Sequence, residues 1–320
     1  MERRIIQSLR KHHKFIVSMH VNPDPDAVAA ALALTLFLRA QGKKVRMVNQ
    51  DDCPSWLNFV PRISLYEKFD EVKHGAFAAE VLVVLDCGDL KRLGSVARLI
   101  RPGVQVINID HHCTNENFGD LNLVEEQYSS TSEILFRLLK KAKCHFTKDI
   151  AMLLYLGILT DTGSFGFDCT SSHTHTVVAE LLKFKFSVSD MYGQAYETLP
   201  RRDLKPFLAL MNRLELFYGE RVACLALTGR DLGSVSDEFD LKDKVFTFLR
   251  SVQGLEVIVI LTEQGKEKTR LNFRSRGSFD VARLAGQFGG GGHKKASGGF
   301  LDQGLTKAKS KVLAAIGKAL

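Results

Sequence analysis

Three adjacent side chains that can bind metal ions, Asp110, His111 and His112, follow an apolar run from Val104 to Ile109. The β-branched residues of this run predict a buried strand. An ionised carboxylate and imidazoles are costly to bury without partners, and a bound cation would be such a partner. The tripeptide therefore predicts a metal site at the carboxyl end of a strand.

Acidic or imidazole side chains also follow other predicted elements. A strand over 14–19 leads to His20, a strand over 81–85 ends at Asp86, and a helix precedes Asp161. In doubly wound sheets, ligands bind outside the carboxyl ends of the strands, so one sheet edge can gather these groups. The predicted set is His20, Asp24, Asp26, Asp86, Asp110, His111, His112 and Asp161.

This set of side chains suits a pair of divalent cations. Two cations held about 3.5–4 Å apart need several carboxylates, one of them bridging, and can activate a shared water as the nucleophile. Imidazole mixed with carboxylate favours Mn²⁺, with Zn²⁺, Co²⁺ or Fe²⁺ as competitors. All-oxygen ligation would have indicated Mg²⁺ or Ca²⁺. The chemistry that this arrangement predicts is hydrolysis of a phosphate ester or anhydride.

Each of these groups has a plainer interpretation when it is taken alone. Asp24 and Asp26 lie in a segment rich in turn-forming residues, and Asp26 alone could cap a helix over 27–39. Adjacent histidines are usually solvated, as we expect for His12 and His13. Because such residues occur at the ends of predicted strands and helices in four separate places, we favour the metal site over these alternatives.

Four ordered segments, HVNPDPDA, VLDCGD, NIDHH and GILTDTGSF, resemble the motifs of the DHH phosphoesterases, and QFGGGGHKKASGGF resembles the glycine-rich segment of the associated DHHA1 domain. The order and spacing match along nearly the whole chain. The two-domain arrangement is similar to that of the nanoRNase/pAp-phosphatase branch of this family. The resemblance implies a manganese-dependent enzyme that removes mononucleotides from very short oligonucleotides and the 3′-phosphate from adenosine 3′,5′-bisphosphate.

The resemblance also implies a role for each site residue. The ligands of one cation would be His20 and Asp24, and those of the other would be Asp26, His111 and Asp161. Asp86 would bridge both cations, His112 would face the scissile phosphate, and Asp110 would orient the site. Pro25 stands where the family usually has a small residue, and it biases Asp24 toward extended backbone.

A second candidate site lies near the end of the chain. Gly289–Gly292 could expose backbone N–H groups to an anion, with charge from the following lysines, and Arg274 could grip a phosphate. The alternative is a flexible glycine linker. The DHHA1 resemblance implies that the terminal phosphate or nucleotide is bound by Arg274, Ser275, Gly291, Gly292 and His293. Such an anchor, held at a fixed distance from the metals across an interdomain cleft, would favour short substrates.

The arrangement of predicted elements is that of an α/β protein. The first half alternates strands (14–19, 44–48, 81–86, 104–109, 121–124) with helices (27–40, 94–100, 131–143, 148–160), which predicts a parallel sheet. The second half predicts a smaller α/β domain with strands at 222–228, 257–262 and 269–275 and helices at 241–252, 280–288 and 305–320. The expected domains are 1–186, a helical connector 187–218, and 219–320.

Composition narrows the class of protein further. A net charge of +8 favours polyanionic ligands. Six scattered cysteines without a C-x-x-C pair argue against a disulfide framework or structural zinc. Without an evident signal peptide or membrane span, we expect a cytoplasmic protein that binds no membrane and could form a homodimer.

Several functions remain open from the sequence. Short oligonucleotides and nucleoside bisphosphates are the leading substrates, with two cations of which Mn²⁺ is favoured over Mg²⁺, Co²⁺ or Zn²⁺. The alternatives are a hydrolase of linear or cyclic dinucleotides and an inorganic pyrophosphatase. From a different class of protein, a non-catalytic nucleic-acid-binding module would be expected to lack part of the metal set.

Overall fold

The computed structural model describes the backbone of residues 1–320 and every side chain except that of Glu71. The chain divides into two compact units, Met1–Glu197 and Thr198–Leu320, and each unit is described by itself.

The first unit is built on a sheet of six parallel strands in the order β3-β2-β1-β4-β5-β6. Its strands are β1 (Lys14–Met19), β2 (Lys44–Asn49), β3 (Tyr66–Lys68), β4 (Val81–Leu85), β5 (Gln105–Asp110) and β6 (Leu121–Val124). The five strands predicted for this half are therefore confirmed, while β3 was not predicted. This strand order is typical of doubly wound sheets, and it reverses between β1 and β4.

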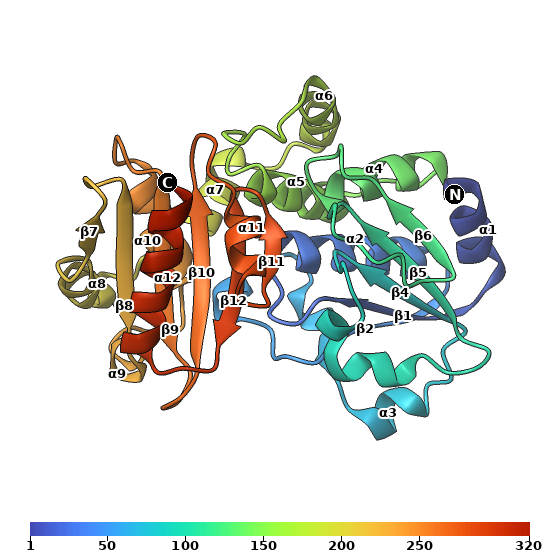
Figure 1. Cartoon of the computed structure of the whole chain (residues 1–320). Helices are drawn as coiled ribbons and strands as arrows, with labels where there is room; N and C mark the ends of the chain where they lie inside the picture. The colour runs from blue at the N-terminus through green and yellow to red at the C-terminus, as the bar shows by residue number, and fades with distance from the viewer. The chain divides into compact units, whose positions relative to one another are not determined.

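Helical segments connect these strands. They are α1 (Glu2–Lys11), α2 (Pro25–Ala40), η1 (Ser55–Leu57), η2 (Ile63–Leu65), α3 (Glu71–Gly75), η3 (Lys91–Leu99), α4 (Thr131–Lys141), α5 (Lys148–Asp161), α6 (Ser172–Leu181), η4 (Leu182–Phe184) and α7 (Val188–Tyr196). Figure 1 shows α2, α4 and α5 together on one side of the sheet. The other side is covered by the apolar residues of η3.

Both faces of the central strands are buried, as the continuous apolar run of β4 shows. Val81, Val83 and Leu85 pack in the core with α2, α4 and α5. Leu82 and Val84 pack on the opposite face with residues of η3. A parallel strand that is covered on both sides reads as an unbroken hydrophobic segment, which is why β4 could be recognised in the sequence.

One prediction about local structure needs correction, and the alternative role of Asp26 as a helix cap is wrong. The helix predicted over 94–100 is the 3₁₀ segment η3, interrupted at Gly94, which has a φ of 60°. Only glycine suits this position, because a Cβ there would lie 2.4 Å from Oε1 of Gln50. The N-cap of α2 is Asp24 rather than Asp26, since the Asp24 side chain accepts a hydrogen bond from the N–H of Ala27.

Pro25 fits the start of α2 well. It stands at the first helical position, where proline has no hydrogen bond to lose. Asp24 has extended backbone (φ −96°, ψ 178°), the conformation that a following proline favours. The proline that departs from the family pattern therefore supports the backbone geometry of Asp24.

The second unit contains a mixed six-stranded sheet in the order β11-β12-β10-β9-β8-β7. Its strands are β7 (Glu215–Phe217), β8 (Val222–Leu227), β9 (Val257–Glu263), β10 (Thr269–Ser275), β11 (Gly291–His293) and β12 (Ala296–Leu301). Only β8 and β9 pair in parallel. The strands predicted at 222–228, 257–262 and 269–275 are confirmed as β8, β9 and β10.

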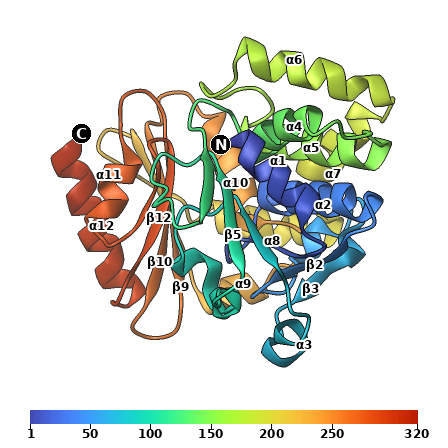
Figure 2. The same cartoon turned by 90° about the vertical axis from the view of Figure 1, so that its right-hand side faces the viewer.

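Helices cover both sides of this second sheet. They are η5 (Arg201–Asp203), α8 (Leu204–Met211), α9 (Gly229–Gly233), α10 (Leu241–Arg250), α11 (Val281–Gly286) and α12 (Leu305–Ala319). Figure 2 shows α11 and α12 on one side of β9 and β10, and α10 on the other. Separate apolar clusters fill the two sides, one with α11 and α12 and the other with α8 and α10. Among the described residues, no helix is both long and apolar enough to span a membrane.

Candidate metal centre

Asp86 lies at the centre of the predicted metal site. Its Oδ2 is 3.4 Å from Nε2 of His20, and its Oδ1 is 3.5 Å from Nε2 of His111 and 3.6 Å from Nδ1 of His112. The residue is 1% exposed. The two oxygens of one buried carboxylate thus face different imidazoles, which is the arrangement that a ligand shared by two cations requires.

The eight predicted site residues of the first unit lie together. Asp86 belongs to three groups in which the candidate ligand atoms all lie within 4.8 Å of one another: His20, Asp24 and Asp86; Asp26, Asp86 and His111; and Asp86, Asp110 and His112. The remaining residue, Asp161 at the end of α5, has Oδ2 3.1 Å from Nε2 of His111. We refer to these eight residues as the carboxylate–imidazole cluster.

The sheet topology explains this convergence. His20 follows β1 and Asp86 follows β4, and these neighbouring strands stand where the strand order reverses. Asp110 ends β5, the next strand. Asp86 also has a positive φ of 54°, which is uncommon for a residue with a side chain but is tolerated best by Asp and Asn. The chain turns sharply at this residue, directly after β4.

The environment of His20 tests whether the cluster fits a cation. Its Nδ1 lies 2.8 Å from the carbonyl oxygen of Val21, which can only accept, so Nδ1 carries the proton. Its buried Nε2 has no hydrogen-bond partner among the described residues and faces carboxylate oxygens of Asp86 at 3.4 Å and Asp24 at 3.6 Å. A neutral imidazole would turn its lone pair toward those oxygens. A cation between them satisfies all three groups.

The pKa values within the cluster are shifted because several carboxylates lie close together. Burial lowers the pKa of His20, but the carboxylates of Asp24 and Asp86 outweigh burial and raise it to about 10. Burial, together with the nearby Asp161 and Asp86, raises the pKa of Asp26 well above its ordinary value. Carboxylates crowded in this way need positive charge to stay ionised, and bound cations would supply it.

Asp110 orients His112. Its Oδ1 lies 2.7 Å from Nδ1 of His112, and its Oδ2 accepts a hydrogen bond of 2.6 Å from Asn115. Asn115 also donates to Asn108, a buried residue of β5 two positions before Asp110. These two asparagines were not predicted as part of the site. The signal for Asn108 was a polar residue inside an otherwise apolar strand.

The start of α4 holds two carboxylates of the cluster. The backbone N–H groups of Thr131 and Ser132 donate to the two oxygens of Asp26, at 2.8 and 3.0 Å. The Thr131 hydroxyl donates to Oδ1 of Asp86 at 2.9 Å. A helix N-terminus stabilises negative charge, so the start of α4 holds both carboxylates in place and favours their ionised form. The sequence predicted only a helix beginning at residue 131 here, and the N-cap of that helix is Ser130, whose hydroxyl accepts a hydrogen bond from the N–H of Glu133.

Gly157, in the middle of α5, provides room for the carboxylate of Asp26. A Cβ at this position would lie 2.2 Å from Oδ1 of Asp26 and 2.1 Å from Oγ of Ser132. Both distances are far below van der Waals contact. Asp26 can therefore occupy its position only because residue 157 of α5 has no side chain.

Gly157→Ala is expected to weaken metal binding by roughly 10–100-fold, as is typical when a group that supports metal ligands is disturbed. Alanine is the better helix former, so the loss would come from the collision with Asp26 and not from the helix itself. Titration with Mn²⁺ measures the effect. Gly193→Ala is the matched control, because a Cβ in that helix meets Glu197 at an ordinary 3.6 Å. Equal Mn²⁺ affinity in both variants would contradict this role of Gly157.

The second unit places the predicted anchor residues along β10 and β11. Arg274 is opposite Ala296 on β12, and Ala296 is opposite His293 on β11, so Arg274 and His293 share one face of the sheet. The guanidinium of Arg274 lies over the ring of Phe246, 4.7 Å from its centroid. The hydroxyl of Ser275 donates to the carbonyl oxygen of Phe279 at 2.7 Å, which ties Ser275 to the following turn.

The glycine run is not an open loop. Gly291 and Gly292 belong to β11, the edge strand that pairs with β12. A Cβ at Gly290 would lie 2.1 Å from the carbonyl oxygen of Gly298, and one at Gly292 would lie 2.7 Å from that of Ala296. The glycines therefore allow two backbones to approach closely, and an edge strand still presents one row of backbone groups to a ligand.

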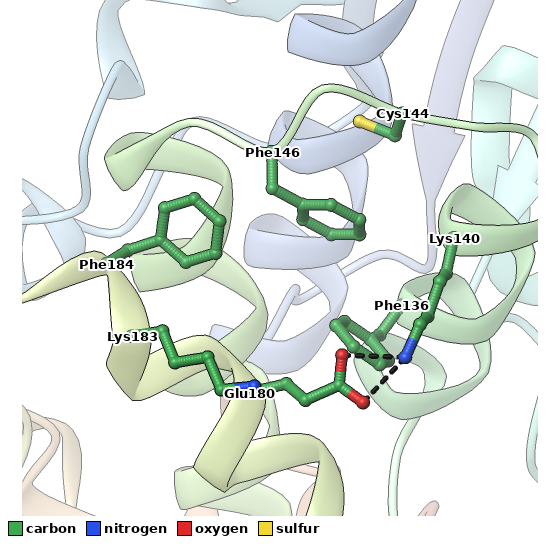
Figure 3. Close-up of a pocket in the computed structure, with 7 residues that line it drawn as sticks. All are labelled: Phe136, Lys140, Cys144, Phe146, Glu180, Lys183 and Phe184. Carbon is green, nitrogen blue, oxygen red and sulfur yellow. Dashed lines mark hydrogen bonds and ion pairs between the residues drawn. The ribbon is translucent and has the colours of Figure 1, made fainter.

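A separate hollow of about 300 Å³ lies in the first unit among α4, α6, η4 and the segment before α5 (Figure 3). Its lining residues are Phe136, Lys140, Cys144, Phe146, Glu180, Lys183 and Phe184. Lys140 Nζ contacts both carboxylate oxygens of Glu180, at 2.6 and 2.7 Å. None of the predicted site residues is among the described residues that line it. The candidate chemistry therefore lies at the sheet edge and not in this hollow.

A doubly wound sheet with a buried carboxylate–imidazole cluster at its carboxyl edge defines the class of protein, an α/β metallohydrolase. The chain belongs to the DHH family of phosphoesterases. The family model described as "DHH family, N-terminal domain" matches residues 14–158, and the model described as "DHHA1 domain" matches residues 227–320. The predicted resemblance is thereby confirmed for both domains.

Relatives match along almost the whole chain. The bifunctional oligoribonuclease and PAP phosphatase NrnA of Thermus thermophilus is 30% identical over 308 residues, which is 95% of this chain and 89% of that protein. The protein of the same name from Bacillus subtilis is 29% identical over 304 residues, 93% and 92% of the two chains. The crystal structure of an exopolyphosphatase-related protein from Bacteroides fragilis superposes with a TM-score of 0.89 at 26% identity, covering 99% and 95% of the chains.

Proposed function

We propose that this protein uses two divalent cations to hydrolyse short oligonucleotides to mononucleotides and to dephosphorylate adenosine 3′,5′-bisphosphate. The observation that carries the proposal is the position of Asp86, which belongs to all three groups of the carboxylate–imidazole cluster. The substrates are those in the names of relatives that match over nearly the full length of both chains.

The cluster divides into two sets of ligands around Asp86. We assign one cation to His20 and Asp24, and the other to Asp26, His111 and Asp161. Two cations, when bound, would supply Lewis-acid activation of a water nucleophile and neutralisation of phosphate charge. The mixture of imidazole and carboxylate favours Mn²⁺, and Mg²⁺, Co²⁺ and Zn²⁺ are the alternatives.

We assign to His112 the role of contacting the reacting phosphate. Asp110 accepts from Nδ1 of His112, so Asp110 fixes the ring and favours a proton on that nitrogen. When both ring nitrogens carry a proton, Nε2 of His112 can donate to the phosphate, and a donor aimed at developing negative charge lowers the barrier of the reaction. Asp110 acts through His112, as a positioning residue held in turn by Asn115.

We assign binding of the substrate's nucleotide to the second unit. Arg274 and His293 share a sheet face, and a guanidinium suits a phosphate because its donors form a planar fork. Ser275, Gly291 and Gly292 complete the anchor, which would hold the terminal phosphate or nucleotide of the substrate. The net charge of +8 agrees with a polyanionic substrate.

A substrate panel tests the proposal. End-labelled di- to pentanucleotides, cyclic dinucleotides, adenosine 3′,5′-bisphosphate and pyrophosphate are incubated with the protein and Mn²⁺ or Mg²⁺, and the products are separated. Release of mononucleotides and of phosphate from the bisphosphate is expected. Hydrolysis confined to pyrophosphate or to cyclic dinucleotides would replace the proposal by that activity. Absence of any hydrolysis by metal-loaded protein would favour a binding module.

Arg274→Ala is expected to split the activities by substrate. Loss of a charge-assisted contact costs about 1.5–3 kcal/mol, which lowers kcat/KM for dinucleotides and adenosine bisphosphate by roughly 10–150-fold. Hydrolysis of bis-p-nitrophenyl phosphate, which is too small to use the anchor, should change much less, and Mn²⁺ content should stay the same.

Arg276→Ala is the matched control for Arg274→Ala, because Arg276 is an exposed arginine just beyond the end of β10. Circular dichroism checks the fold of both variants, since Arg274 also packs on Phe246. An equal loss on all substrates, or no loss on any, would show that Arg274 does not hold the nucleotide.

A further inference from the structure

The face of β10 and β12 on the side of α10 is cationic and partly exposed. Alternate residues of β10, Leu271 and Phe273, are buried in the core with α11 and α12. The residues between them, Arg270, Asn272 and Arg274, point to the other face and are only partly buried. On the neighbouring strand β12, Phe300 is directly opposite Arg270 and lies on that same face.

Phe300 is an exposed aromatic ring surrounded by positive charge. It is 48% exposed. Lys268 places Nζ 4.9 Å from the ring centroid, and Arg270 places Cζ 6.0 Å from it. An aromatic face beside cations is the combination that binds single-stranded nucleic acid, because a base stacks on the ring and the cations receive its phosphates.

Two carboxylates at the start of α10 lie near the cations of this face, Asp240 near Arg270 and Lys242, and Asp243 near Arg274. Among the described residues, Arg270 has neither an ion pair nor a hydrogen-bond acceptor for its guanidinium. Burial lowers the pKa of Lys242 on α10, and the charges of Arg270 and Arg274 lower it further. Asp240 also accepts hydrogen bonds from the N–H groups of Lys242 and Asp243 at the start of α10. A bound anion would satisfy these cations.

A buried hydroxyl beside Arg270 also lacks a partner. Thr262 on β9 is directly opposite Arg270 and is 2% exposed. Its Oγ1 makes no hydrogen bond among the described residues, and the same holds for Oδ1 of Asn272. Buried polar atoms are nearly always paired, so two unpaired atoms beside an unpaired guanidinium indicate a polar ligand.

We propose that this face, formed by Lys242, Thr262, Lys268, Arg270 and Phe300, binds an inner nucleotide of oligonucleotides longer than a dinucleotide. The base stacks on Phe300, and Arg270 and Lys268 hold its phosphates. Arg270 and Arg274 are four residues apart on one strand, a distance of about 13 Å, so the two arginines contact different nucleotides. The inference rests on the proposed function, and it adds a preference for chain length.

The experiment measures kcat/KM for adenosine bisphosphate, a dinucleotide and a tetranucleotide in three variants. Phe300→Leu removes the stacking ring but keeps an apolar side chain, and Arg270→Gln removes the charge. Phe248→Leu is the matched control, because Phe248 is a 54% exposed phenylalanine on α10. Phe300→Leu should lower kcat/KM for the tetranucleotide by about 5–150-fold, the range expected for one stacked base. The two shorter substrates should stay within about twofold of the wild type.

Two further measurements distinguish stacking from a structural effect. A tetranucleotide with an abasic sugar at an inner position should be insensitive to Phe300→Leu. Arg270→Gln should reduce the slope of log affinity against log salt by about one, the value for one lost phosphate contact. Equal changes on all lengths, or no change on the tetranucleotide, would overturn this inference while leaving the proposed function intact. If the wild type hydrolyses no oligonucleotide at all, the proposed function itself fails.

Discussion

Asp86→Asn is expected to abolish hydrolysis while the protein remains folded. Asparagine keeps the shape of the side chain and tolerates the left-handed backbone at this position, where φ is 54°. It removes the charge and one of the two carboxylate oxygens that face His20 and His111. Because a shared ligand is lost, the effect on turnover should exceed the roughly 10²–10³-fold that is typical of losing one hydrogen-bond donor.

The measurement combines turnover with metal content and circular dichroism. Metal analysis should show fewer than two cations per chain at a Mn²⁺ concentration that saturates the wild type. Asp168→Asn is the control, because Asp168 is an exposed acidic residue and the change in net charge is the same. Normal turnover by a folded Asp86→Asn protein would exclude a two-cation site centred on this residue.

The sequence was most informative where residue type and strand position agree. The strands β1, β4 and β5 are apolar because the sheet buries both of their faces, so their ends could be located to within a residue. Parallel strands bring their carboxyl ends to one edge. That geometry predicts from the sequence alone that His20, Asp86 and Asp110 lie close together.

The residues that the sequence did not reveal act through contacts between distant segments. Thr131 begins a helix as many threonines do, and its contacts with Asp26 and Asp86 arise only when α4 packs beside α2 and β4. Gly157 matters because of what a Cβ would strike. Such roles depend on long-range approach, and neither local propensity nor spacing along the chain contains that information.

The second unit shows the same limit for short strands. Gly291 has no side chain that could alternate between faces, so β11 could not be distinguished from a loop. Phe300 illustrates a different limit. It lies in β12, which is not among the predicted strands, and its exposed ring lies beside Arg270. A single exposed ring is recognised only when the register of its neighbours is known.

His112→Ala is expected to keep the metals and lose turnover. Nδ1 of His112 lies 2.7 Å from Oδ1 of Asp110 and 3.6 Å from Oδ1 of Asp86. Removal of a donor that acts on the developing phosphoryl charge should lower kcat by about 10²–10³-fold with little change in Mn²⁺ affinity. Asp110→Asn should lower kcat in the same direction, because an amide oxygen holds the imidazole less firmly than a carboxylate does.

His111→Ala is expected to fail in the opposite way, through loss of a cation. Nε2 of His111 lies 3.1 Å from Asp161 and 3.5 Å from Asp86, within the second set of ligands. Its removal leaves carboxylates crowded without an imidazole to complete the site, so Mn²⁺ binding should weaken and turnover should recover partly at high Mn²⁺ concentration. His112→Ala should show no such recovery. If metal analysis finds the reverse pattern, with metal lost from His112→Ala and kept by His111→Ala, the two adjacent histidines have exchanged the roles assigned to them.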